Sequence, residues 1–244
     1  TYDLFSVQFA SGNQGLGSSL AGYVTEGSGG VMIPEWFYSG YHLQGQDFRV
    51  DTLLVNEMKK LGDKRLETSV TEGYWDTTEH GFTPEDSAKH YKERCMMIKY
   101  LVKDNTNKTI KAWNDYPLNF PILRPADAYL LYAEALINNN KASQAKEWID
   151  AIRQRADLSP LDHVPTMDDV MDERRYEFIG EGKRYFDLVR MGKDTFVSTL
   201  KNFSDHYEHV TKMGANNPSE KDLLLPIPLT VMNIQASWTN NPGY

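Results

Sequence analysis

The stretch from residue 173 to residue 190 combines carboxylates and guanidinium groups in equal number: Glu173, Glu177, Glu181, Asp187, Arg174, Arg175, Arg184 and Arg190. Two of the carboxylates could act as an acid and a base, as carboxyl pairs about 5–9.5 Å apart do in glycoside hydrolysis. A catalytic acid, however, needs an apolar environment that raises its pKa, whereas guanidinium groups satisfy carboxylates through paired hydrogen bonds. The balance of charges therefore favours a structural ion-pair network, to which we add Arg124, over a catalytic pair.

Aromatic residues in the first half of the chain are the best candidates for ligand contact. Tryptophan and tyrosine offer flat apolar rings, and tyrosine adds a hydroxyl group, which together suit the apolar faces and hydroxyl rims of sugars. Segments that look like loops leave such rings free of core packing. The candidates are Trp36, Tyr38, Tyr41, Tyr74, Trp75, Trp113 and Tyr116. For each of them, packing in the core is the open alternative.

Other chemical groupings are weaker. His206 and His209 could share one face of a helix, but no third metal ligand is placed by the sequence, so we expect a solvated face and no metal site. Asp162 and His163 have no spacing typical of a catalytic triad. The glycine-rich stretch near the start contains no phosphate-binding motif. We therefore expect no cofactor.

Helical patterns dominate from residue 119 onward. Apolar residues recur at helical spacing over 125–138, 141–156, 167–179, 183–191 and, more weakly, 194–203, with one earlier helix at 51–61. Pro125 suits a first helical position. Thr166 and Asp169 resemble a capping box, and Gly62 marks the end of the first helix.

Residues 129–160 fit one tetratricopeptide-like hairpin. Small residues, Ala133 and Ala145, would let the two helices approach, while Ile149 and Ile152 fill the seam between them. We predict that Trp148 also belongs to the core. One repeat cannot bury both of its faces, so we expect further repeats upstream of the first residue. An ordinary helical hairpin is an equal alternative.

Residues 1–118 look irregular by comparison. Short strands are predicted near 4–9, 66–71 and 95–102. The predicted fold is therefore mostly α-helical, a tetratricopeptide-like scaffold with a loop-rich region of short strands. We divide the chain into 1–118, which carries the candidate aromatics, and 119–244, and expect both to form one structural domain whose N-terminal part is missing.

The composition excludes some functions. With a net charge of −8, the chain lacks the clustered basic residues that nucleic acid or an anionic membrane surface would require. A single cysteine, Cys95, allows no disulfide framework. No apolar run approaches the roughly 18 residues of a membrane span. The first residues also lack the pattern of a signal peptide.

Four motifs from residue 119 onward resemble the C-terminal part of the SusD/RagB family. They are Asn119–Leu136 around the sequence "RPADAYLLYAEAL", Ile152–Leu158 with "IRQRADL", Glu173–Gly192, and the pair "LPIP" at Leu225–Pro228 and "NPGY" at Asn241–Tyr244. The segment Gly62–Arg65, "GDKR", is a weaker match. The sequence departs from the family pattern at Asp157, where glycine is usual, and at Gly180, where a bulkier residue is usual.

The resemblance implies a surface lipoprotein of a Gram-negative outer membrane. Such proteins cover a SusC-like TonB-dependent transporter and capture glycans, or peptides in some members, before import. The family's lipid-bearing N-terminal cysteine is absent from this chain, and Cys95 lies mid-chain. We therefore expect non-catalytic binding of oligosaccharides in polysaccharide utilisation, without nucleic acid. The alternatives are peptide import, a glycoside hydrolase, and a tetratricopeptide scaffold that binds a protein partner.

Overall fold

The computed structural model describes residues 4–8, 10, 50–76, 81–83, 91–97, 99, 119–211, 218–235 and 237–244. The chain forms two compact units, residues 1–182 and residues 183–244, and each is described by itself. The described part is mostly helical with a few short strands, which confirms the predicted fold class. The prediction of a division at residue 118 stays a prediction.

A helical hairpin forms the scaffold of the first unit. Helix α5 (Pro125–Asn138) begins with Pro125 in its first turn, and α6 (Ala142–Arg155) follows after a short turn. Their facing sides bury Leu130, Ala133 and Leu136 on α5, and Ala145, Ile149 and Ile152 on α6. The small alanines therefore lie in the seam between the two helices, as predicted.

Trp148 departs from the predicted core position. Its ring is only half-buried and makes edge-on contacts with Tyr129 and Tyr132, with ring centroids 5.0 and 5.1 Å apart. Both tyrosines are exposed on α5. The reason is position on the helix: Trp148 directly precedes Ile149, which takes the seam, so the indole ring lies at the edge of the hairpin.

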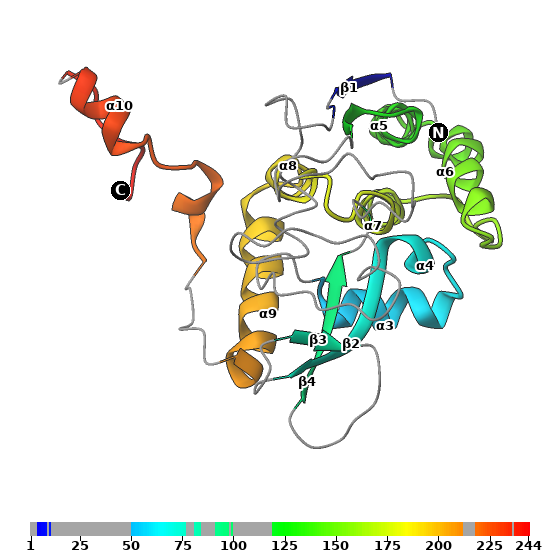
Figure 1. The fold of residues 1–244 in the computed structure, drawn as a ribbon. Helices are drawn as coiled ribbons and strands as arrows, with labels where there is room; N and C mark the ends of the chain where they lie inside the picture. Colours follow the sequence, from blue (N-terminus) through cyan, green and yellow to red (C-terminus); the bar gives the residue numbers. More distant parts are fainter. Residues whose placement is uncertain are drawn as a thin grey trace. The chain divides into compact units, whose positions relative to one another are not determined.

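Helix α7 (Met167–Glu177) packs against α5 and α6 (Figure 1). The Thr166 hydroxyl accepts from the Asp169 backbone, and the Asp169 carboxylate accepts from the Thr166 backbone at 2.7 Å, which forms the predicted capping box. The helix ends two residues earlier than the predicted 179, because a turn runs from Phe178 to Gly182. In this turn Gly180 has φ 75° and Gly182 has φ 70°.

Helix α3 (Thr52–Leu61) is capped by the side chain of Asp51, which accepts from the Leu53 backbone at 2.9 Å. Gly62 ends it in the left-handed conformation, with φ 71°. The strand predicted over 66–71 is mostly wrong, because Leu66–Ser69 forms a short helix, α4, and the strand begins at Val70. The Leu66 backbone donates to the Asp63 carbonyl at 3.2 Å, which continues the turn that α3 leaves.

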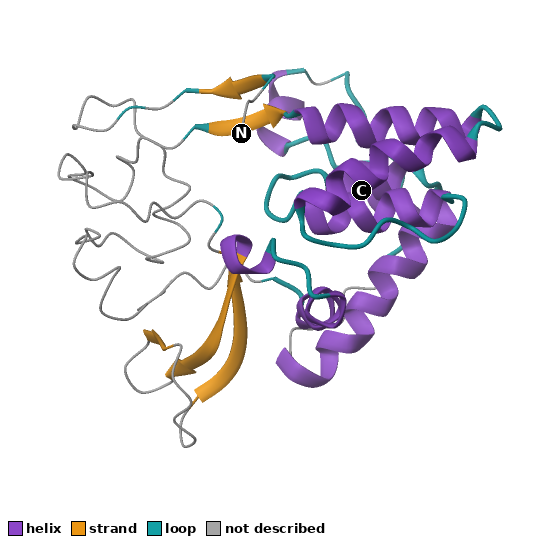
Figure 2. Ribbon diagram, turned by 90° about the vertical axis from the view of Figure 1, so that its right-hand side faces the viewer, coloured by secondary structure: helices purple, strands orange, loops and turns teal. Residues whose placement is uncertain are grey.

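Two small sheets accompany these helices. Strand β1 (Phe5–Val7) pairs antiparallel with β5 (Phe120–Leu123), directly before α5. Strand β2 (Val70–Asp76) lies between β3 (Gly81–Thr83) and β4 (Tyr91–Met97), all antiparallel. The strand predicted near 95–102 therefore begins earlier than expected, at Tyr91. Figure 2 shows β2 leaving α4 and running outward beside β4.

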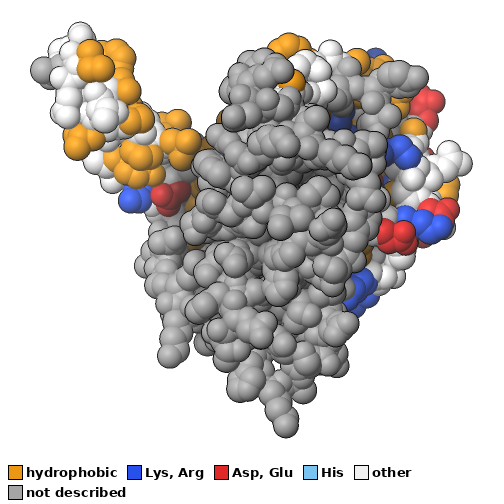
Figure 3. All heavy atoms as spheres, in the orientation of Figure 1, with side chains coloured by type: hydrophobic (Ala, Val, Ile, Leu, Met, Phe, Trp, Pro, Cys, Tyr) orange, Lys and Arg blue, Asp and Glu red, His pale blue; other side chains and the backbone are white. Residues whose placement is uncertain are grey.

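The second unit contains α8 (Arg184–Arg190), α9 (Lys193–Thr211), a short 3-10 helix η1 (Glu220–Leu223) and α10 (Leu229–Ile234). Helix α9 is longer than the predicted 194–203. The Tyr185 hydroxyl donates to the Leu223 carbonyl at 2.9 Å and thereby ties α8 to η1. Figure 3 shows hydrophobic side chains gathered on the C-terminal segment, and the exposed ones include Leu224, Leu225, Leu229, Ile234 and Trp238.

Candidate functional site

Three glutamates form a buried column along α7 and the turn that follows it. Glu173 and Glu177 lie one helical turn apart, and Glu181 follows in the turn. Their exposed fractions are 1%, 3% and 4%. Carboxylates this deeply buried require compensating partners, since removal of a charge from water is costly.

Arg65 joins the first two glutamates to the end of α3. Its Nη1 atom lies 2.6 Å from Glu173 Oε1 and 3.1 Å from Glu177 Oε2. Its Nε atom donates to Asp63 Oδ1 at 2.9 Å, and the Arg65 backbone donates to the same oxygen. The left-handed Gly62 turns the chain so that Asp63 and Arg65 face α7. The segment after α3 is thus fixed to α7 through one guanidinium group.

Arg124 joins the second and third glutamates to the start of α5. It binds Glu181 with two parallel bonds, from Nε at 2.9 Å and Nη2 at 2.6 Å, and Glu177 Oε1 from Nη1 at 2.8 Å. Its guanidinium group also lies over the ring of Phe178, 5.0 Å from the centroid. The position is set by Pro125, which begins the helix and leaves Arg124 extended before it.

Two arginines at the end of α6 reach the same column. Arg153 Nη1 lies 3.4 Å from Glu173 Oε2, and Arg155 contacts Glu177 Oε2. Both sit in the last turn of α6. The glutamates of α7 therefore also fix the second helix of the hairpin.

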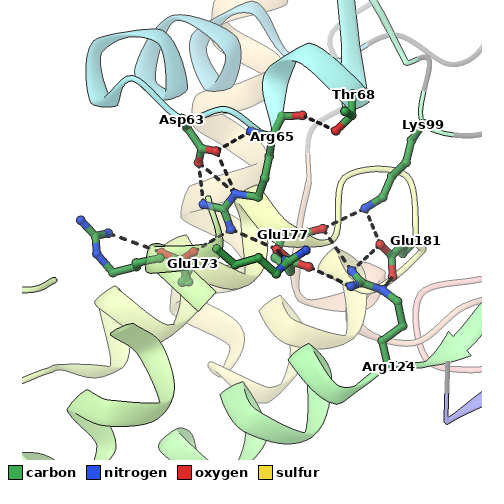
Figure 4. A network of polar contacts seen from close by, with 10 residues as sticks. Asp63, Arg65, Thr68, Lys99, Arg124, Glu173, Glu177 and Glu181 are labelled. Atoms are coloured by element: carbon green, nitrogen blue, oxygen red, sulfur yellow. Dashed lines mark hydrogen bonds and ion pairs between the residues drawn. The ribbon is translucent and has the colours of Figure 1, made fainter. Parts of the chain in front are cut away.

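Lys99 approaches the column from the end of β4. Its Nζ atom donates to the Glu177 carbonyl at 2.9 Å and to the Glu181 carboxylate (Figure 4). The side chain is 23% exposed. The column thus connects four segments distant in sequence: the α3–α4 turn, β4, the β5–α5 junction and the end of α6. We call this group the glutamate hub: Asp63, Arg65, Lys99, Arg124, Arg153, Arg155, Glu173, Glu177 and Glu181.

Every carboxylate oxygen of the three column glutamates has a cationic partner, supplied by Arg65, Arg153, Arg155, Arg124 or Lys99. Burial raises the pKa of Glu173 against the opposing effect of Arg65. Burial also acts to raise the pKa of Glu177, but the charges of Arg155 and Arg124 outweigh it, and the net shift is downward. An acid–base pair would need a carboxyl group available to substrate, and these oxygens are already occupied.

Three other arginines of the predicted network contact carboxylates outside the column. Arg174 donates to Asp127 at 2.8 Å, with both side chains buried, and Arg175 contacts Glu57. In the second unit, Arg190 lies 3.1 Å from Asp187. Arg184 begins α8. The structure therefore brings Arg124, Glu173, Glu177 and Glu181 of the predicted network into one cluster.

Five hub residues were not among the predicted network: Asp63, Arg65, Lys99, Arg153 and Arg155. Two signals could have found most of them. Asp63 and Arg65 lie in the "GDKR" segment, and Arg153 and Arg155 lie in the "IRQRADL" segment, and both segments resemble family motifs. No signal in the sequence points to Lys99.

The candidate ligand contacts are mostly beyond the described part of the chain. Trp36, Tyr38, Tyr41, Trp113 and Tyr116 lie outside the described residues. Tyr74 and Trp75, which were predicted to lie in a loop, belong to β2, where they pair with Glu93 and Lys92 of β4. The strand forms because partners distant in sequence supply its hydrogen bonds, which local composition does not reveal.

The two histidines considered as metal ligands, His206 and His209, both lie in α9. Within the part of the chain that the structure describes, no group of three or more His, Cys, Asp or Glu side chains is arranged to hold a metal ion. The described helices also include none that is both long and apolar enough to cross a membrane.

His163 offers a separate electrostatic test near the start of α7. Its ring nitrogens lie 2.8 Å from Asp162 Oδ1 and 3.1 Å from Asp169. These hydrogen bonds, Asp162 first, raise the pKa of His163 above 6.5. Because the pKa of His163 is higher in the folded chain than in the unfolded chain, protonation of its ring stabilises the fold. This stabilisation is complete below the unfolded-state pKa and is lost as the pH rises through the folded-state pKa. A proton NMR titration of His163 should therefore give a midpoint above 6.5.

The matched variants for this titration are Asp162→Asn and Asp168→Asn. The first removes a carboxylate that contacts the ring and should lower the His163 midpoint. The second removes a charge from the same region of α7, in its first turn, and should change the midpoint much less. Equal effects of the two substitutions would contradict the assignment of the shift to these contacts.

A family model described as "SusD family" matches residues 8–244. The chain belongs to the SusD family. This confirms the resemblance that the four motifs indicated. The family is one of glycan-binding proteins, and the motif Glu173–Gly192 supplies all three glutamates of the column.

Curated SusD relatives match parts of the chain. The starch-binding protein SusD of Bacteroides thetaiotaomicron is 32% identical over 162 residues, which are 65% of this chain and 28% of that protein. A SusD-like protein of Bacteroides ovatus is 37% identical over 112 residues, covering 43% of this chain and 20% of that protein. The matched parts are thus less than a third of these relatives' lengths.

Solved structures of the SusD fold match nearly the whole chain. Surface glycan-binding protein A from Bacteroides thetaiotaomicron has a TM-score of 0.70 and 24% identity, covering 98% of this chain and 51% of that one. A structure of surface glycan-binding protein A from the same organism, in complex with laminarihexaose, has a TM-score of 0.70 at 22% identity. The chain therefore has the fold of about half of these proteins.

Proposed function

We propose that this chain binds oligosaccharides without cleaving them, at the outer-membrane surface, for uptake through a SusC-like TonB-dependent transporter. Membership of the SusD family supports the binding role. The observation that carries the non-catalytic part is the glutamate hub, in which each column oxygen faces a cation. The acids of the most family-specific motif thus hold the fold together, and ligand capture falls to aromatic rings elsewhere.

The ligand contacts that we propose are Trp36, Tyr38, Tyr41, Tyr74, Trp75, Trp113 and Tyr116. Their support is chemical: ring faces stack on the apolar faces of sugars. They all belong to the region before the helical hairpin. The hairpin and α7 would then serve as the rigid support from which this region presents its rings.

Titration calorimetry with a panel of laminarin- and starch-derived oligosaccharides tests the binding role. The panel follows the ligands named for the relatives. A triple variant, Trp36→Ala with Trp75→Ala and Trp113→Ala, should lower the affinity at least about tenfold, because it removes three of the proposed apolar ring faces at once. Thin-layer chromatography of the same mixtures should show no cleavage products.

Trp238→Ala is the matched control, because this tryptophan is 51% exposed and lies in the second unit, outside the candidate region. It should leave the affinity unchanged. Circular dichroism should confirm that both variants fold. Binding of peptides but not sugars would indicate peptide import instead, and sugar products on the chromatogram would indicate a hydrolase. An unchanged affinity in the triple variant would refute the aromatic assignment.

The transporter partnership has a test of its own. A gene for a TonB-dependent transporter beside the gene for this chain, and copurification of the two products from outer membranes, would be expected. The absence of the chain from the outer-membrane fraction would contradict the proposed location.

A further inference from the structure

Among the described residues, one end of the β2–β4 pair contacts the helices α3 and α4. At that end Val70 of β2 pairs with Met97 of β4, and both side chains are buried. The Val50 backbone, just before α3, donates to the Cys95 carbonyl at 2.8 Å. At the opposite end Asp76 pairs with Tyr91. The sheet therefore has a base, formed by Val70, Cys95 and Met97, that meets the helical scaffold (Figure 2).

The turn after α7 touches this base through Gly180. A Cβ atom added to Gly180 would lie 1.9 Å from the Met97 sulfur, so the end of the Met97 side chain would have to move to make room for it. Gly180 also has φ 75°, which favours glycine. The methionine side chain thus lies directly against the glycine backbone.

Lys99 makes a second connection two residues further along. Its ammonium group donates to the Glu177 carbonyl at 2.9 Å and to the Glu181 carboxylate, on either side of Gly180. Arg124 holds Glu181 from the opposite side. One apolar contact and one ionic contact therefore fix the end of β4 to a turn that the glutamate hub itself holds rigid.

We propose that the turn from Phe178 to Gly182 sets the position of the three-stranded sheet relative to the helices, with Gly180 and Lys99 as positioning residues for ligand binding. The second part rests on the proposed function, because β2 carries the candidate contacts Tyr74 and Trp75. A sheet held at its base transmits any displacement of that base along its strands. A side chain at position 180 would therefore displace Met97 and loosen the base of the sheet.

Cys95 provides a direct probe of this attachment. It is the single cysteine of the chain and is 2% exposed, in β4 at the base of the sheet. A thiol reagent such as 5,5′-dithiobis(2-nitrobenzoate) labels it only when the base opens. The labelling rate under native conditions therefore measures how firmly the sheet is held.

Gly180→Ala and Gly182→Ala form a matched pair for this measurement. Both glycines have positive φ, 75° and 70°, so both substitutions strain the backbone to a similar degree. Only the first adds an atom that collides with Met97, since no atom lies within 4 Å of a Cβ at position 182. Gly180→Ala should label Cys95 at least about tenfold faster than Gly182→Ala and bind the oligosaccharide more weakly.

Two further variants separate positioning from general loss of structure. Met97→Ala in the Gly180→Ala background removes the collision and should return the labelling rate towards that of Gly182→Ala. Lys99→Met should speed labelling and weaken binding, while Lys99→Arg, which keeps the charge, should restore both in large part.

Equal labelling rates in the two glycine variants would contradict the proposal that the turn holds the base of the sheet through Gly180. Faster labelling in Gly180→Ala with unchanged oligosaccharide affinity would overturn the positioning role. If the wild-type chain binds no oligosaccharide at all, the proposed function fails and the positioning role fails with it, whereas the labelling rates still decide whether the turn holds the sheet.

Discussion

Replacement of Glu177 by glutamine is expected to lower the free energy of unfolding by about 3 kcal/mol, because it removes a shared counter-charge from two buried arginines, Arg65 and Arg124. Glu177 contacts Arg65 at 3.1 Å, Arg124 at 2.8 Å, and Arg155. Glutamine keeps the shape of the side chain but removes the charge that these groups share. Urea denaturation followed by circular dichroism measures the loss without screening the ion pairs.

Glu173→Gln is the matched control for this substitution. Glu173 lies one turn away and is as deeply buried, but burial raises its pKa, whereas the net shift at Glu177 is downward. Removal of its charge recovers part of the cost of burial, so we expect a smaller loss than for Glu177→Gln. Equal losses for the two substitutions would contradict the assignment of Glu177 as the centre of the hub.

The two pKa shifts predict opposite effects of pH. Because the pKa of Glu177 is lowered in the folded chain, its charge contributes stability that is present above pH 4.5. This contribution is lost as the pH falls through the folded-state pKa. The raised pKa of Glu173 gives a contribution that is lost as the pH rises from 4.5 through its folded value. Below pH 4.5 the wild-type chain should therefore lose stability more steeply than Glu177→Gln.

Leu130→Ala should lower the free energy of unfolding by about 3 kcal/mol, because it removes a large side chain from a filled seam and leaves a cavity. Leu130 is fully buried in α5, at an exposed fraction of 0%. Its neighbour Leu131 is 40% exposed on the same helix and provides a matched control of identical chemistry. Thermal and urea denaturation measure both variants.

Leu131→Ala should change the stability by less than about 1 kcal/mol, since an exposed leucine leaves no cavity. A similar loss in both variants would mean that the seam between α5 and α6 is not where this hairpin is held together. A small loss in both would mean that the hairpin contributes little to the stability of the chain.

The helices could be read from the sequence because their signals are local. Pro125 begins α5, Gly62 ends α3, and the Thr166 capping box begins α7, each within a few residues of the feature that it sets. The alternation of small and branched residues also revealed which side of the hairpin is buried. Asp157, where the family pattern has glycine, adopts φ 63°, so the turn is kept although the residue differs.

The hub and the sheets depend on partners distant in sequence, which no local pattern shows. Arg65 meets Glu173, 108 positions later, and Lys99 meets Glu181, 82 positions later. Equal numbers of carboxylates and arginines indicated ion pairing but could not assign the pairs. Arg174, for example, donates to Asp127 of α5 and not to a glutamate of the column. Strand β2 was likewise missed at Tyr74 and Trp75, because its pairing with β4 creates it.

The oligosaccharide affinity of Glu173→Gln, measured by calorimetry beside the wild type on a glycan that the wild type binds, tests the central claim most directly. This variant should remain folded, so its affinity reports on the role of the column itself. We predict equal affinities and no sugar products with either protein. Cleavage of the glycan by the wild type that disappears in Glu173→Gln, or a loss of binding in a folded variant, would show that these acids contact substrate.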